Sequence, residues 1–172
     1  MVRTLSDLGF VEAPVGLDEV AHRFRRQAVT VDVLAPEGVG RRTDLRTVGR
    51  ATTVEIPGGT FALRRSAGVE VTVAGRRGVV HRPDVLGALV VKSRAVVADA
   101  RRGPERHLRD LAFLYTLVQD PIALRDELSS ANRRRLRAVR EVADADPACW
   151  SSLGDAELIF RARAALDLMG SP

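Results

Sequence analysis

The spacing of hydrophobic residues changes once along the chain, near Pro83. Before Pro83, apolar and polar side chains alternate in short runs such as residues 29–34, and this period of two is typical of β-strands. After Pro83, apolar side chains recur every three or four residues, as in amphipathic helices. The pattern predicts an α+β fold with a small mixed sheet in residues 1–82. A helical bundle in residues 83–172 is expected to cover the open face of the sheet, so that both regions form one compact unit.

Turn-forming residues divide the two regions into elements. Residues 35–46, rich in glycine and proline, are predicted to form a loop, and Pro83 is expected in the first turn of a helix. Trp150 and Phe160 are expected in the helical core. The predicted strands are 29–34, 52–56, 68–73 and 78–81, and the predicted helices are 60–65, 83 to the break at 103–104, 105–118, 122–128, 130–144 and 155–168.

Composition narrows the protein class. The 172 residues are 45% hydrophobic and 28% charged, which is typical of a folded globular chain. There is no apolar run of about 18 residues, and the N-terminal segment lacks the apolar core of a secretory signal, so a cytoplasmic protein without a membrane partner is expected. The single cysteine, Cys149, cannot form an internal disulfide, and the three histidines do not form a zinc motif with it.

The basic residues are strongly biased towards arginine. Lys92 is the only lysine among 27 basic side chains, and this usage favours a GC-rich, bacterial source. Arginine does not replace a compact ammonium that acts as a point charge on a phosphate or carboxylate. Lys92 is therefore a candidate phosphate-binding residue, although chance retention of one lysine is the alternative. The net charge of +5 permits a phosphate-bearing partner without requiring one.

Asp32 is an acidic residue inside an otherwise apolar strand. Burying it without a partner would cost several kcal/mol, so it is expected to face solvent, a cation or a metal. One interpretation places Asp32 on the solvent-exposed face of a sheet whose other face is covered by helices. The other makes it a carboxylate that holds a divalent cation over a phosphate, because magnesium prefers hard oxygen ligands.

Several short segments, in order, resemble a known family. They are His22-Arg-Phe24, residues 29–34, residues 86–92, Arg101-Arg102 and residues 109–111. Together they resemble the nucleotidyltransferase-fold proteins of the abortive-infection toxin group, the AbiEii/AbiGii type of toxin–antitoxin system. The resemblance covers most of residues 1–120.

The resemblance implies roles for three residues. Asp32 corresponds to the third metal-binding carboxylate of the family, Lys92 to a helical lysine and Asp110 to an aspartate of the next helix. It implies transfer of a nucleotidyl group from a nucleoside triphosphate, aided by Mg²⁺. Asp32 would hold the metal or activate the acceptor hydroxyl, Lys92 would neutralise phosphate charge, and Asp110 would orient Lys92. An ordinary ion pair with Arg106 is the alternative for Asp110.

One family motif does not occur in the sequence. No Gly-Ser pair is followed about ten residues later by Asp-x-Asp, so two of the three expected carboxylates are missing. The resemblance therefore implies a truncated or degenerate member that binds a nucleoside triphosphate, tRNA or another RNA, with weak or no transfer activity. A non-catalytic subunit completed by a partner chain, such as an antitoxin, is an alternative.

A basic helix supplies a third functional hypothesis. Arg133, Arg134, Arg137 and Arg140 share much of one face of the predicted helix 130–144, which suits contact with a nucleic-acid phosphate backbone. Glu141 follows directly and reduces the net positive charge of this face. The alternative to a nucleic-acid surface is therefore an ordinary solvent-exposed helix face.

Overall fold

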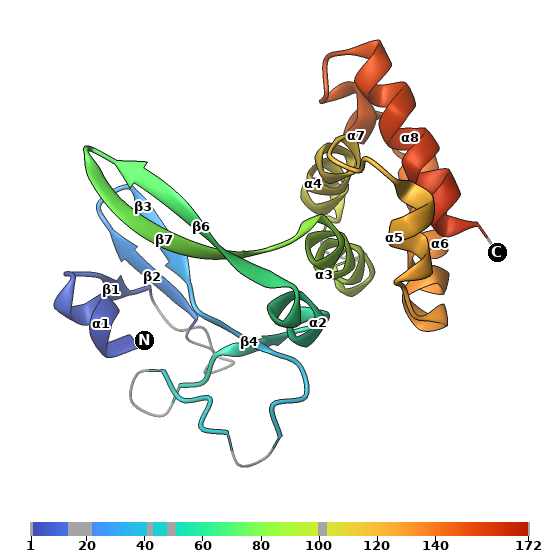
Figure 1. Cartoon of the computed structure of the whole chain (residues 1–172). Coiled ribbons are helices and arrows are strands. Elements are labelled where there is room, and N and C mark those ends of the chain that lie inside the picture. The colour runs from blue at the N-terminus through green and yellow to red at the C-terminus, as the bar shows by residue number, and fades with distance from the viewer. Residues whose placement is uncertain (1, 14–21, 41–42, 48–50, 100–102, 172) are drawn as a thin grey trace. The chain divides into compact units, whose positions relative to one another are not determined.

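The computed structural model describes residues 2–13, 22–40, 43–47, 51–99 and 103–171, and it confirms the α+β class (Figure 1). Contacts divide the chain into two compact units, the N-terminal unit Met1–Thr60 and the C-terminal unit Phe61–Pro172. The strands before Pro83 that follow Thr60 therefore belong to the same unit as the helices, whereas the sequence pattern grouped them with the earlier strands.

The N-terminal unit begins with helix α1 (Val2–Asp7) and a three-stranded antiparallel sheet. The sheet has the order β1-β2-β3, formed by β1 (Val11–Glu12), β2 (Arg23–Arg26) and β3 (Val29–Asp32). Its register places Arg23 of β2 directly opposite Asp32 of β3. The predicted strand 29–34 is thus found, but it is interrupted after Asp32.

A second, parallel pair of strands follows in the same unit. Strand β4 (Leu34–Pro36) pairs with β5 (Val54–Ile56), so the predicted loop 35–46 was wrong at its first two residues. Ala35 is buried in this strand, whereas Leu34 is exposed. In the described part of the chain the strands form three small sheets, where the sequence pattern suggested one mixed sheet.

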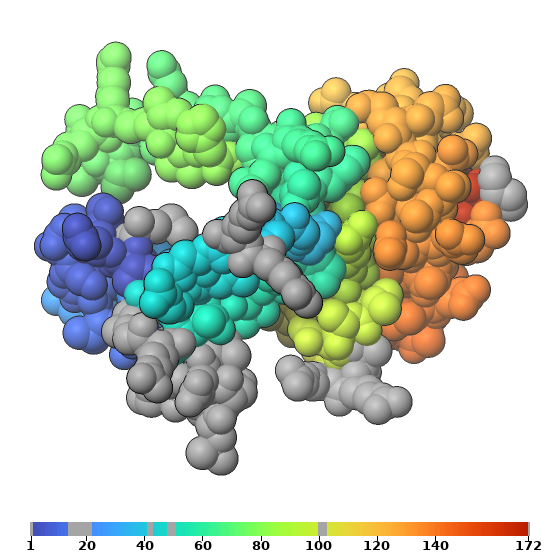
Figure 2. Space-filling model, turned by 90° about the horizontal axis from the view of Figure 1, so that it is seen from below, coloured from blue at the N-terminus to red at the C-terminus, as the bar shows by residue number. Residues whose placement is uncertain are grey.

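The C-terminal unit contains a long antiparallel hairpin. Strands β6 (Ser66–Val73) and β7 (Arg76–Pro83) follow the short helix α2 (Gly59–Arg64) and pair along their whole length, which confirms and extends the predicted strands. Ala74 and Gly75 have φ values of 48° and 76°, the left-handed conformation that a tight two-residue hairpin turn requires. The hairpin extends away from the helices of its own unit and is largely exposed (Figures 1 and 2).

Helices make up the remainder of the C-terminal unit. Pro83 ends strand β7 instead of starting a helix, which corrects the sequence-based expectation. The helix begins after Asp84, whose carboxylate accepts a hydrogen bond of 2.8 Å from the Gly87 amide as an N-cap. The helices are α3 (Val85–Ala98), α4 (Glu105–Thr116), α5 (Pro121–Asp126), α6 (Ser130–Ala145), α7 (Pro147–Ser151) and α8 (Ala156–Gly170), of which α7 was not predicted.

One apolar cluster holds these helices together. It includes fully buried leucines of α3 and α6, Tyr115 of α4 and Met169 of α8. Trp150 is buried as expected, and its indole N–H donates to the Ala143 carbonyl at 3.1 Å. Phe160 is 74% exposed, so its expected place in the core was wrong; it lies on the outer face of α8. None of the described helices is long and apolar enough to cross a membrane.

Candidate functional site

Lys92 and Asp110 form an ion pair between two neighbouring helices. Lys92 lies on α3, and its side chain is only partly exposed. Its Nζ atom lies 2.6 Å from Oδ2 of Asp110 on α4. The two side chains are 31% and 39% exposed, respectively. The pair is therefore anchored by both helices and open to a solute.

Asp110 contacts Lys92 and not Arg106, the partner considered as its alternative. A pairing between Asp110 and Arg106 would have joined residues of one helix, whereas the observed contact joins α3 to α4. A second contact connects the same helices, since Nε2 of His107 lies 3.0 Å from Oδ2 of Asp99. These two contacts define the α3/α4 seam, which holds Lys92 in one place.

Asp32 lies in the N-terminal unit and also has a cationic partner. Arg23 donates from Nε to Oδ1 at 2.8 Å and from Nη2 to Oδ2 at 2.9 Å, because the register of β2 and β3 places the two residues opposite each other. The hydrogen bond and the charge of Asp32 raise the pKa of Arg23. Asp32 is exposed, as the alternating pattern predicted, and its carboxylate is engaged by arginine.

The described residues do not fit a magnesium site. A site of that kind needs at least one or two available carboxylates in addition to substrate phosphates. Both oxygens of Asp32 are bound by Arg23, and within the described ranges no three histidine, cysteine, aspartate or glutamate side chains are grouped to hold a metal ion.

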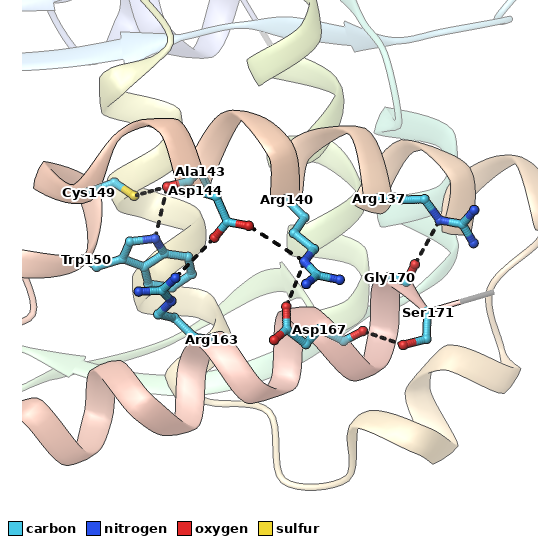
Figure 3. A network of polar contacts seen from close by, with 10 residues as sticks. All are labelled: Arg137, Arg140, Ala143, Asp144, Cys149, Trp150, Arg163, Asp167, Gly170 and Ser171. Carbon is cyan, nitrogen blue, oxygen red and sulfur yellow. Dashed lines mark hydrogen bonds and ion pairs between the residues drawn. The ribbon is translucent and has the colours of Figure 1, made fainter.

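The arginines of α6 divide into two sets. Arg137 donates from Nε to the Gly170 carbonyl at 3.1 Å, and Nε of Arg140 lies 2.8 Å from Asp167 and 3.7 Å from Asp144 (Figure 3). The contacts with Gly170 and Asp167 connect α6 to α8, whereas Asp144 belongs to α6 itself. Arg133 is half-buried and Arg134 is exposed. The candidate nucleic-acid surface is thus partly used to hold the C-terminal helix.

Arg65 is a polar centre that sequence reasoning did not identify. Its Nη2 atom lies 2.6 Å from Asp84, and its Nη1 atom lies 2.8 Å from Glu127. Burial would raise the pKa of Asp84, but Arg65 and the Gly87 amide outweigh it and lower the pKa below its usual value. The partners of Arg65 are 19 and 62 residues away in sequence, so no local pattern could have indicated the cluster.

A hollow of about 410 Å³ lies beside this cluster, where the first turn of α3 meets the segment between α4 and α5. Its walls include Val85, Leu117 and Leu124, and Gln119 and Ala123 lie at its rim. The hollow is lined by the first turn of α3, by the segment that follows α4 and by α5. The sequence analysis did not identify the hollow, because its walls come from segments that are separate in the chain.

Comparisons with family models, curated proteins and solved structures find no match for this chain. Of the segments that carry the family resemblance, Arg101-Arg102 lies outside the described residues. Lys92 and Asp110 are brought together by the fold, whereas Asp32 belongs to the other unit.

Proposed function

We propose that this chain is a nucleotidyltransferase-like protein that binds a nucleoside triphosphate, with Lys92 as the phosphate-binding cation and Asp110 as its positioning residue. The observation that carries the proposal is the 2.6 Å contact between the only lysine of the chain and a carboxylate of the neighbouring helix. An ammonium has three N–H donors, and Asp110 accepts from one of them. The other two remain for phosphate oxygens.

Transfer of a nucleotidyl group by the chain alone is expected to be weak or absent. Arg23 occupies the carboxylate of Asp32, so Mg²⁺ or an acceptor hydroxyl would have to displace this arginine before Asp32 could act on either. The proposal therefore concerns binding of the triphosphate, with RNA as the acceptor class that the family resemblance implies. An antitoxin or completing subunit would have to supply further carboxylates for rapid transfer.

The binding experiment measures the affinity for ATP, CTP, GTP and UTP by calorimetry, with and without Mg²⁺. Lys92→Met is expected to weaken binding about tenfold or more, because a charge-assisted hydrogen bond contributes roughly 1.5–3 kcal/mol. Lys92→Arg should restore part of the affinity. Arg134→Met is the matched control, since it removes one exposed positive charge from the same unit. Unchanged binding by Lys92→Met would refute the proposal.

The role of Asp110 is tested by a double-mutant cycle. Asp110→Asn should weaken triphosphate binding several-fold when Lys92 is present and have no effect in a Lys92→Met background. A purely structural contribution of Asp110 would lower affinity equally in both backgrounds. Labelled nucleoside triphosphates incubated with tRNA and Mg²⁺ provide the separate test of transfer.

The exposed hairpin supports a second candidate, the interaction subunit. Strands β6 and β7 pair only with each other among the described strands, and Val73, Val79 and Val80 are each more than half exposed. A two-stranded sheet with open edges can add a strand from another chain. Light scattering should detect self-pairing that Val80→Lys abolishes, whereas a strict monomer at high concentration would exclude self-pairing.

A further inference from the structure

The hollow beside α3 has the size and lining of a small-ligand site. Its volume of about 410 Å³ lies within the roughly 300–1,000 Å³ range of ligand pockets. The walls are mainly aliphatic, and Gln119 supplies an amide that both donates and accepts hydrogen bonds. Such a lining suits a flat, apolar ring with polar groups along its edge.

The hollow lies at one end of the two helices that carry the Lys92–Asp110 pair, next to the start of α3 and the C-cap of α4. Val85 precedes Lys92 by seven residues on α3, and Leu117 follows Asp110 by seven residues at the end of α4. Seven residues make about two helical turns, or roughly 10 Å along each helix. This separation is comparable with that between the terminal phosphates and the base of an extended nucleoside triphosphate. Between the two places α3 carries Ala88, a small half-buried side chain.

The charged groups at the hollow and at the Lys92–Asp110 pair differ. Asp84 and Asp120 lie at the hollow, where their carboxylates cap α3 and α5 by accepting hydrogen bonds from Gly87 and Ala123. Arg65 pairs with Asp84, and none of the described residues that line the hollow is a cation, whereas the other end presents the ammonium of Lys92, which is paired with Asp110. A ligand with an uncharged ring at the hollow and negative charge near Lys92 suits this arrangement.

We propose that the hollow binds the nucleobase of the nucleoside triphosphate whose phosphates contact Lys92, with Gln119 hydrogen-bonded to the edge of the base. This inference rests on the proposed function, and it adds a base-recognition surface that the sequence analysis did not identify. The aliphatic walls cover the faces of the base. Gln119 can hydrogen-bond to the edge of the base, because its amide both donates and accepts.

The test fills the hollow without disturbing the core. Ala123 lies at the rim and its side chain is exposed, so Ala123→Trp should place an indole in the hollow while α5 keeps its backbone contacts. Ala138→Trp is the matched control, since Ala138 is an exposed alanine of α6 in the same unit. Calorimetry with ATP and with inorganic tripolyphosphate separates recognition of the base from recognition of the phosphates. Thermal denaturation verifies that each variant is folded.

Ala123→Trp should weaken ATP binding about tenfold, the equivalent of roughly 1.4 kcal/mol of lost base contacts, and leave tripolyphosphate binding unchanged. Lys92→Met should weaken binding of both probes, and Ala138→Trp should affect neither. If Ala123→Trp binds ATP like the wild type while Lys92→Met does not, the base site is refuted and the proposed function stands. If Lys92→Met has no effect on either probe, or the wild type binds neither, both proposals are refuted. Equal loss of ATP and tripolyphosphate binding in Ala123→Trp would also refute the base site.

Discussion

The two units of this chain are stabilised in different ways. Residues 61–172 contain a continuous apolar cluster built by α3, α4, α6, α7 and α8, whereas the buried apolar residues in the described part of the first sixty are Phe24, Val33, Ala35 and Ala51. The N-terminal unit instead shows strand pairing and exposed ion pairs such as Arg23–Asp32. Because exposed pairs contribute little, apolar burial makes the C-terminal unit the more resistant to unfolding. The candidate site around Lys92 lies in this unit.

The largest expected effect comes from a cavity in the helical core. Leu86→Ala removes a fully buried side chain of α3 and should lower the free energy of unfolding of the C-terminal unit by about 3 kcal/mol. Val29→Ala, at an exposed position of β3, should change stability by less than about 0.5 kcal/mol. Hydrogen exchange followed by mass spectrometry measures the protection of backbone amides in each unit separately. Equal loss of protection in both units after Leu86→Ala would contradict the proposed difference.

Alkaline pH should destabilise the C-terminal unit selectively. All lysine, tyrosine and cysteine residues of the chain lie after Thr60. Burial, aided by Asp146, raises the pKa of the Cys149 thiol from 9.0 to about 11. Below pH 9 the thiol is protonated in both the folded and the unfolded state, so the stability of the unit is at its full value. Between pH 9 and about pH 11 the thiol ionises in the unfolded state but stays protonated in the folded state. The free energy of unfolding therefore falls over this range.

The loss of unfolding free energy caused by ionisation of Cys149 should reach roughly 2 kcal/mol, because one unit of pKa shift corresponds to about 1.4 kcal/mol. Cys149→Ala should remove this part of the pH dependence in urea titrations at pH 8, 9, 10 and 11. Burial also raises the pKa of Tyr115 above its usual 10.0, so Tyr115→Phe should remove a further loss that begins near pH 10. An unchanged profile in the double variant would show that other groups carry the effect.

A smaller effect is expected for Arg65→Met. Arg65 bridges Asp84 and Glu127, and its side chain is less exposed than that of Arg23. Its loss should cost about 1 kcal/mol, and Arg23→Met, the matched change in the N-terminal unit, less than about 0.5 kcal/mol. Chemical denaturation at pH 7 measures both.

The stability difference between Arg65→Met and the wild type should depend on pH in the acid range. The lowered pKa of Asp84 means that its stabilising contribution is present above the usual value of 3.8 and is lost as the pH falls through the lower folded value. Arg65→Met should therefore differ less from the wild type in strong acid than at pH 7. A constant difference across this range would argue against the Arg65–Asp84 pair as the cause.

The smallest effect concerns the arginines of α6. Arg140→Met should lower stability by about 0.5 kcal/mol and increase hydrogen exchange in α8, because Arg140 contacts Asp167 of that helix. Arg134→Met should leave both unchanged, since Arg134 is exposed. If RNA binding is found and Arg134→Met weakens it while Arg140→Met does not, the exposed arginine set is the nucleic-acid surface. The reverse result would contradict this division of the helix.

Local patterns were sufficient for much of the fold. Alternation predicted the hairpin strands around Gly75, and helical spacing predicted all the longer helices of the C-terminal unit, because each signal is contained in a few neighbouring residues. The same rules misplaced Pro83 and Phe160. Proline is compatible with both the end of a strand and the start of a helix, and an exposed phenylalanine is not distinguishable from a buried one by spacing alone.

The amino-acid sequence by itself determined the periodicity of each segment, the turn chemistry, and the presence of a single lysine among many arginines. Only the tertiary structure decided which charges meet: Lys92 with Asp110, Arg23 with Asp32, and Arg65 with two distant carboxylates. It also decided that the start of α3, the segment after α4 and α5 line one hollow. Secondary structure follows from interactions between near neighbours in the chain, whereas ion pairs and hollows depend on how whole elements pack, and that packing is set by the summed burial of many distant side chains.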